Sequence, residues 1–212
     1  KLTELPEQIG QLQALRVLKV QNQALGTGGV NGAPTAPTAK ALPASLSGLT
    51  GLRILDLSGN QLRAADIPDL SPLIQLDEFR ASNNPLALFP TGLTKIPTIE
   101  KIIIRNAGMA GDFPNLELLP KLTHVDLAGN DLYGSLPAAL LLTAPNLVQL
   151  DVNNNILSGP VPVFPAGQET RLVDAIKLGG NHFLCPPEGA PDPIGLGTNC
   201  EKRPQIAAGG IS

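Results

Sequence analysis

Three side chains in the middle of this 212-residue chain are of the types that transfer protons: His124, Asp126 and Asp151. His124 and Asp126 alternate along the segment LTHVDL, and Asp151 occupies the same place as Asp126 in the similar segment LVQLDV. If the two segments are neighbouring strands, the carboxylates lie side by side, and their repulsion can raise a pKa. Paired carboxylates of this kind can act as general acid and base. The alternative is a solvated polar face.

The rest of the sequence offers little to complete such an active site. No nucleophile motif accompanies the carboxylates, GTGG at 26–29 is not followed by GK[S/T], and GxGxxG is absent. Two cysteines with only His182 nearby do not make a four-ligand metal site. We therefore favour the solvated face and expect no enzyme, no cofactor and no metal ion.

Composition excludes two further classes of partner. The chain has 15 Lys and Arg against 18 Asp and Glu, a net charge of −3, without a block of like charge, so nucleic acid is not an expected partner. No apolar run approaches 18 residues, so we expect no membrane span within this segment. Aromatic residues make up only 3%, which favours an interior of leucine, isoleucine, valine and asparagine.

A repeated apolar pattern must position the polar residues. Its clearest copy is LTHVDLAGNDLYGSLPAAL at 122–140, which reads L-x-x-L-x-L-x-x-N-x-L. Val125 and Leu127 point to one face of a strand, and the residues on either side of Val125 point to the other. Seven segments follow this pattern, and they begin at Leu15, Leu52, Leu76, Ile99, Leu122, Leu147 and Val173.

The seven segments keep a regular spacing. They begin 37, 24, 23, 23, 25 and 26 residues apart, and an insertion at 26–40 enlarges the first step. A second column, an apolar residue followed by proline, keeps the same phase: Leu5-Pro6, Leu42-Pro43, Ile67-Pro68, Phe89-Pro90, Phe113-Pro114, Leu136-Pro137 and Val161-Pro162. On these two columns the chain resembles leucine-rich repeat proteins, whose repeats are 20–29 residues long.

The resemblance implies an α/β repeat solenoid over residues 1–183. We expect a right-handed arc with a parallel sheet of about seven strands on its concave face and short 3₁₀-helical, helical or extended segments on its convex side. Behind the prolines in 67–76 and 89–99, apolar residues three apart predict a short helix or a 3₁₀ turn. The resemblance also implies a column of buried asparagines that bond to backbone groups: Asn60, Asn84, Asn130, Asn155 and Asn181. Gln23 and Ala107 would interrupt this column.

From residue 109 onward three coils share the form L-x-G-x-φ-P, in which φ is apolar. They place glycine at Gly111, Gly134 and Gly159. The form resembles the plant-specific subtype of leucine-rich repeat, in which glycine permits a backbone turn and a second short strand forms beside the main sheet. Plant receptor ectodomains, polygalacturonase-inhibiting proteins and some kinetoplastid surface antigens carry it. The absence of Asn-x-Ser/Thr sequons weakens the plant assignment.

The end of the chain resembles the cap of extracellular leucine-rich repeat proteins, because N-x-φ-L-C at 181–185 is followed by a second cysteine. The resemblance implies a cap over 184–200 closed by a Cys185–Cys200 disulfide, and an oxidising compartment. The alternative is two free thiols. Residues 201–212 are expected to be a tail. The insertion at 26–40 is interpreted as a tolerated surface loop, with a binding loop as the alternative.

Function is expected on the concave face. The mixed charges of the middle coils could form one patch around an exposed Ile103, which is typical of a protein-binding site. The equal alternative is an ordinary polar sheet with internal ion pairs. The candidate ligand-binding residues are Glu78, Arg80, Lys101, Ile103, Arg105, His124, Asp126, Gln149, Asp151 and Asn153.

The leading hypothesis is a monomeric, extracellular or cell-surface module that recognises a protein, peptide or glycan. LPEQIGQLQAL and LPASLSGLTGL also resemble the Ras-related leucine-rich repeat proteins, which makes an intracellular scaffold the first alternative. An enzyme inhibitor of the polygalacturonase-inhibitor type is the second, and it predicts acidic concave residues.

Overall fold

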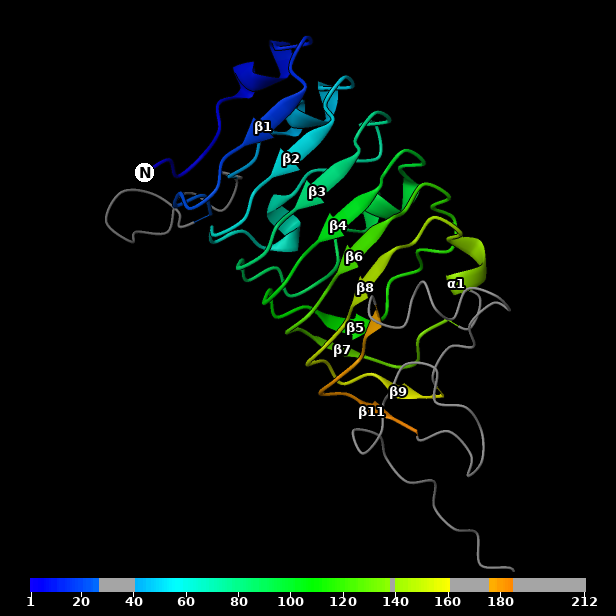
Figure 1. The fold of residues 1–212 in the computed structure, drawn as a ribbon. Coiled ribbons are helices and arrows are strands. Elements are labelled where there is room, and N and C mark those ends of the chain that lie inside the picture. Colours follow the sequence, from blue (N-terminus) through cyan, green and yellow to red (C-terminus); the bar gives the residue numbers. More distant parts are fainter. Residues whose placement is uncertain (27–40, 138–139, 161–175, 185–212) are drawn as a thin grey trace, which may run out of the picture.

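The structure is a computed structural model that describes residues 1–26, 41–137, 140–160 and 176–184. These residues form a stack of coils, each of which contributes one strand to a single parallel sheet (Figure 1). The strand order along the sheet is β1-β2-β3-β4-β6-β8-β10, so the prediction of about seven parallel strands is confirmed. The strands are β1 (Val17–Lys19), β2 (Ile54–Asp56), β3 (Glu78–Arg80), β4 (Lys101–Ile103), β6 (His124–Asp126), β8 (Gln149–Asp151) and β10 (Ile176–Lys177).

The register of the sheet is the one that the repeat predicts. The apolar centre of each strand pairs with the centre of the next, from Leu18 in β1 to Ile176 in β10. From β2 to β8 these central side chains are fully buried. The residues before and after each centre therefore project from the other side, and we call the surface they form the sheet face.

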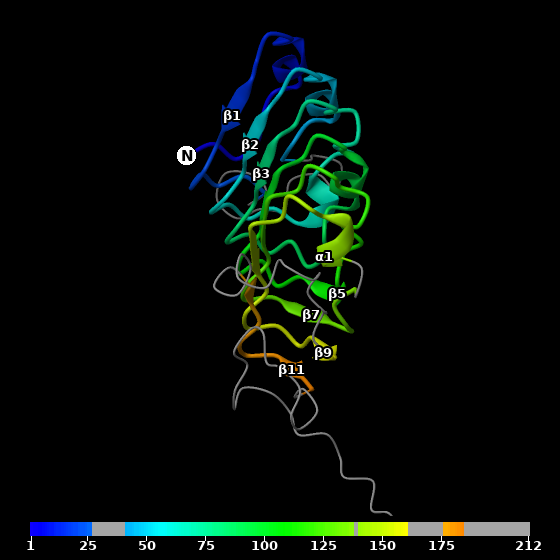
Figure 2. The same ribbon diagram turned by 45° about the vertical axis from the view of Figure 1, so that its right-hand side comes forward.

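Short helices occupy the side of the stack opposite the sheet face (Figure 2). The 3₁₀ helices are η1 (Glu7–Gln11), η3 (Ala44–Gly48), η4 (Ala64–Asp66) and η5 (Thr91–Lys95), and α1 (Leu140–Thr143) is one α-helical turn. The prediction behind Pro90 is confirmed by η5. In 67–76 the predicted 3₁₀ turn is present without a helix: the Leu73 nitrogen donates to the Leu70 carbonyl and the Leu76 nitrogen to the Leu73 carbonyl, both at 2.9 Å, whereas η4 lies before Pro68. Proline restricts the residue before it to extended backbone, and both Ile67 and Ser71 precede a proline.

The asparagine column joins each coil to the one before it. Asn130 donates through Nδ2 to the carbonyls of Ile104 and Leu127, both at 2.8 Å. Its Oδ1 accepts from the backbone nitrogens of Ala107 and Met109, at 3.0 and 3.1 Å. Asn60, Asn84, Asn155 and Asn181 make the same kinds of bonds.

The two expected interruptions of this column differ. Gln23 does not interrupt it, because its Oε1 accepts from the Leu2 nitrogen at 3.2 Å and its Nε2 donates to the Gln21 carbonyl at 3.1 Å. The longer side chain thus bonds both coils as asparagine does elsewhere. Ala107 does interrupt it, and the backbone of the preceding coil changes its bonding there.

A second set of short strands forms where the glycine-containing coils turn. β5 (Ala110–Asp112) pairs with β7 (Asp131–Tyr133), and β9 (Ser158–Gly159) pairs with β11 (His182–Phe183), all in parallel. Gly111, Gly134 and Gly159 have φ angles of 120°, 78° and 84°, a region that L-residues with side chains rarely adopt. The expected second strand beside the main sheet is therefore present in these coils.

Several predicted segments lie outside the described residues. They are most of the insertion, the cap with Cys185 and Cys200, and the tail. No helix of the described part is long and apolar enough to cross a membrane.

Replacing Asn130 with alanine tests how much one asparagine of the column stabilises the fold. The side chain is buried, and its loss leaves two backbone donors and two carbonyls without their partner. We expect the free energy of unfolding to fall by about 2 kcal/mol or more, measured by urea denaturation. Asn106→Gly is the matched control, because Asn106 is exposed at a φ of 49°, and it should change stability by about 0.5 kcal/mol or less. An Asn130→Ala midpoint equal to that of the control would contradict the assigned role.

Candidate ligand-binding face

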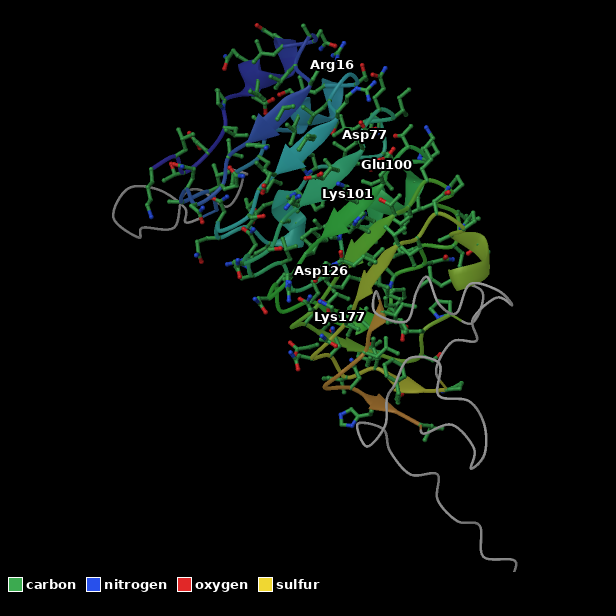
Figure 3. All side chains as sticks on the ribbon, viewed as in Figure 1. Arg16, Asp77, Glu100, Lys101, Asp126 and Lys177 are labelled. Carbon is green, nitrogen blue, oxygen red and sulfur yellow. The ribbon has the colours of Figure 1, made fainter. Side chains whose placement is uncertain are left out.

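The predicted candidate residues lie on neighbouring strands of the sheet face. Figure 3 labels Lys101, Asp126 and Lys177, which project from β4, β6 and β10. Glu78 and Arg80 come from β3, and Gln149 and Asp151 come from β8. Arg105 and Asn153 follow the ends of β4 and β8. The fold thus brings residues that are more than 70 positions apart onto one surface, where they divide into two groups.

The first group is an arginine between two buried carboxylates. Arg105 places Nη1 3.1 Å from Oδ2 of Asp126 and Nη2 3.8 Å from Oδ2 of Asp151. Asp126 and Asp151 are only 7% and 2% exposed. The small Ala128 occupies the place of Arg105 in the next coil.

Burial raises the pKa of the Asp126 carboxyl, and the nearby Asp151 carboxylate adds to the rise. The Ala128 backbone nitrogen and Arg105 act in the opposite direction. A raised pKa beside a second carboxylate is what acid–base chemistry requires. The hydrogen bonds of these carboxylates, however, indicate a structural role.

Each of these aspartates holds the turn that follows its strand. Oδ1 of Asp126 accepts from the Ala128 nitrogen at 3.3 Å, and Oδ1 of Asp151 accepts from the Asn153 nitrogen at 3.2 Å. Asp56, at the end of β2, makes the same kind of bond, in which its Oδ1 accepts from the Ser58 nitrogen at 3.0 Å. Sequence reasoning missed this role, although the recurrence of aspartate at one position of LDLSGN, VDLAGN and LDVNNN was its signal.

The second group surrounds Glu78. Its carboxylate pairs with Arg80 of the same strand and, at 3.9 Å, with Lys101 of β4. His124 follows Lys101 in register on β6, and its Nδ1 lies 2.8 Å from the Thr123 hydroxyl. Burial and the Lys101 charge lower the pKa of His124, whereas Glu78 raises it. These pairs are partly exposed, so each contributes about 0–1 kcal/mol.

Ile103 is half-buried, so the expectation of an exposed apolar centre is wrong. The sheet register places Ile103 between Arg80 on β3 and Asp126 on β6. The described part of this face instead exposes Val17, on the edge strand β1, at 45%. Among the described residues no group of three or more His, Cys, Asp or Glu side chains could hold a metal ion.

Comparison with known proteins agrees with this architecture. A sequence model of the Leucine Rich Repeat family matches residues 51–73. The ectodomain of the Arabidopsis receptor kinase HAESA, solved with an IDA peptide hormone, superposes with a TM-score of 0.66 at 26% identity, covering 85% of this chain and 28% of that one. The chain folds as a leucine-rich repeat solenoid. A leucine-rich repeat protein of Leptospira interrogans shares the fold, with a TM-score of 0.68 at 24% identity over 86% of this chain and 42% of that one.

Two curated leucine-rich repeat relatives match about half of the chain. Receptor like protein 24 of Arabidopsis thaliana is 36% identical over 114 residues, which are 51% of this chain and 13% of that protein. The mouse transforming growth factor beta activator LRRC32 is 31% identical over 112 residues, 50% of this chain and 17% of that protein. The chain therefore spans less than a fifth of the length of these relatives. The HAESA match is to its leucine-rich repeat ectodomain and the Arabidopsis thaliana relative is a receptor-like protein, so these matches agree with a non-catalytic leucine-rich repeat segment.

Asp126→Asn tests the buried carboxylate through the pH dependence of stability. The carboxyl titrates near 3.8 in the unfolded chain and at a higher pH in the folded one. The protonated carboxyl therefore makes its full contribution to stability below the unfolded pKa of 3.8. This contribution is lost as the pH rises through the folded pKa. Asparagine cannot ionise and keeps an acceptor for the Ala128 nitrogen. Between about pH 3 and 7 the stability of the variant, relative to the natural protein, should rise with pH in urea denaturation.

Asp69→Asn is the control of opposite sign. Hydrogen bonds from the Ser71 nitrogen and hydroxyl lower the pKa of Asp69. That carboxylate stabilises the fold above its unfolded pKa, so the relative stability of Asp69→Asn should fall as the pH rises. If the stability of both variants, relative to the natural protein, changed in the same direction with pH, the raised pKa of Asp126 would be refuted.

Proposed function

We propose that this leucine-rich repeat solenoid is an extracellular or cell-surface binding module that recognises a protein or peptide through its sheet face, with a glycan as a further ligand class. The observation that carries the proposal is the continuous parallel sheet, which presents mixed charged side chains on adjacent strands. The similar HAESA ectodomain was solved with a peptide hormone, which supports a peptide as the first ligand to test.

The bonding within the face indicates which residues are available to a ligand. Arg105, Asp126 and Asp151 bond to one another and to backbone, so they belong to the scaffold of the face. Lys101 and Gln149 are half-buried and lie on either side of His124 in the sheet register, and Lys177 is exposed on β10. Lys101 has only a 3.9 Å ion pair, which an incoming carboxylate can replace at small cost.

The repeat subtype supports an extracellular location. The second strands and the left-handed glycines of the L-x-G-x-φ-P coils fit the subtype that plant receptor ectodomains carry. The proposed Cys185–Cys200 disulfide fits the same compartment. An intracellular scaffold is the alternative, and the state of the two cysteines separates it from the leading proposal. No observation favours the inhibitor, because Asp56, Asp126 and Asp151 are buried and bonded within the protein.

Changing the charge at Lys101 and Gln149 tests whether the sheet face is the binding surface. The purified domain is used to select binders from a random peptide display library, and each binder is then titrated against variants. Lys101→Glu combined with Gln149→Arg should weaken the selected peptides tenfold or more, about 1.4 kcal/mol or more, while the unfolding midpoint stays close to that of the natural protein. The substitutions change only the side chains and leave the backbone hydrogen bonds of both positions, from the Lys101 nitrogen to Asp77 and from the Gln149 nitrogen to Thr123, in place.

Lys121→Glu is the matched control, because Lys121 is an exposed lysine that lies before β6 and not on the sheet face. Peptides that lose affinity for the Lys121 variant and keep it for the Lys101 and Gln149 variant would remove the sheet face as the binding surface.

The cysteines decide the compartment. Protein from its native source is alkylated without reduction and digested, and the peptides are identified by mass spectrometry. We expect a linked pair containing Cys185 and Cys200, whose closed loop would contribute about 3 kcal/mol in the chain-entropy model. Alkylated thiols at both positions would favour the intracellular scaffold instead.

A further inference from the structure

A second β surface forms beside the sheet face, where the glycine-containing coils turn (Figure 2). The Ile156 nitrogen donates to the Leu132 carbonyl at 2.8 Å, so the pair of strands β5 and β7 continues into the pair β9 and β11. Along these strands, exposed residues alternate with buried or half-buried ones. We call the surface that the exposed residues form the lateral face: Ala110, Asp112, Asp131, Tyr133, Ser135, Ile156, Ser158 and His182.

Two large apolar side chains lie next to each other on the lateral face. Tyr133 is 50% exposed and Ile156 is 48% exposed. Ser158 pairs with Ser135, so two residues earlier on each strand Ile156 lies opposite Tyr133. Neighbouring strands are about 4.8 Å apart, and the two side chains therefore form one apolar surface. Single exposed apolar residues are normal, but this adjacent pair includes the only tyrosine of the chain, a residue type enriched at the centre of protein interfaces.

The charge around Tyr133 is negative. Asp112 pairs with Tyr133 in the register of β5 and β7, and Asp131 lies on the same face of β7, two residues before Tyr133. Oδ1 of Asp112 is 3.0 Å from the place where a Cβ would stand on Gly134. The Asp112 carboxylate thus extends over β7, into space that is free because the residue after Tyr133 has no side chain.

Both carboxylates are available to a partner. Asp112 and Asp131 are exposed, and neither side chain has a hydrogen bond or an ion pair among the described residues. The described residues of the lateral face include no lysine or arginine. On the sheet face, in contrast, Glu78 and Asp126 both pair with cations. The lateral face therefore carries uncompensated negative charge beside an apolar surface.

We propose that the lateral face docks a basic segment of a partner protein. An arginine of that segment lies on the ring of Tyr133 and pairs with Asp112 and Asp131, and a neighbouring apolar side chain contacts Ile156. The guanidinium group fits this arrangement because it is planar, stacks on aromatic rings and donates two parallel hydrogen bonds to a carboxylate. The lateral face is separate from the sheet face, so the proposal does not rest on the function proposed above.

The test uses the whole domain, labelled with ¹⁵N, and two acetylated and amidated tetrapeptides that alternate leucine with either arginine or citrulline. Citrulline keeps the length and the planar end of arginine but has no charge. The arginine peptide should shift the amide resonances of 110–112, 131–135 and 156–158 with saturation. The citrulline peptide should bind about fivefold more weakly or worse, because it cannot form the ion pairs.

Asp112→Asn combined with Asp131→Asn removes both carboxylates and keeps the size of the side chains. It should weaken the arginine peptide about tenfold and leave the citrulline peptide unchanged. The unfolding midpoint should stay close to that of the natural protein, because neither carboxylate is bonded within the described residues. Glu4→Gln combined with Glu7→Gln is the matched control. It removes the same charge at two exposed residues near the first strand and should change neither affinity.

Tyr133→Leu tests the ring, because leucine keeps an apolar side chain and cannot make a cation–π contact. It should weaken the arginine peptide about threefold. The absence of a saturable shift, equal binding of the two peptides, or unchanged arginine-peptide affinity in the Asp112 and Asp131 variant would each overturn the proposal. Shifts confined to the strands of the main sheet would also overturn it and would assign the binding to the sheet face.

Discussion

The buried amide of the repeated asparagine is the interaction on which this solenoid depends. A coil that turns away from its strand buries backbone donors and acceptors that no sheet partner can reach, and these groups must be satisfied. One asparagine side chain has both an acceptor and two donors, so it can satisfy its own coil and the preceding coil together, as Asn130 does. The side chain therefore ties each coil to the coil before it.

The aspartates of the sheet face also satisfy backbone donors, in this case those of the turns that follow the strands. Asp56, Asp126 and Asp151 each use one oxygen to hold the turn after the strand, and only the other oxygen faces outward. The second oxygen of Asp56 accepts a hydrogen bond from Gln21. The second oxygens of Asp126 and Asp151 both pair with Arg105. Residues that first suggest catalysis are therefore part of the scaffold. The raised pKa of Asp126 is the consequence of burying a structural carboxylate.

The sequence was sufficient to predict the sheet register, because alternation with a period of two fixes which residues share a face, and one column of repeats fixes which residues are neighbours. It was not sufficient for burial on that face. Ile103 is half-buried between β3 and β6, and Arg105 reaches across the β6 coil to Asp151. Burial and contacts of this kind depend on the lengths of side chains from neighbouring coils. The helix η4 was not predicted, and it ends before Ile67, which Pro68 restricts to extended backbone.

The gap at Ala107 shows how a repeat protein can vary its surface without losing its core. Ala107 is buried, and the adjacent Ile102 and Ile104 remain fully buried, so the coil keeps its interior. The change appears only in the preceding coil, where one backbone nitrogen finds another acceptor and one residue takes a left-handed conformation. Backbone strain of about 1–2 kcal/mol is small against a core of this size, and the continuous apolar stack can offset it. A break in the asparagine column therefore changes the backbone and the surface of one coil and leaves the buried stack intact.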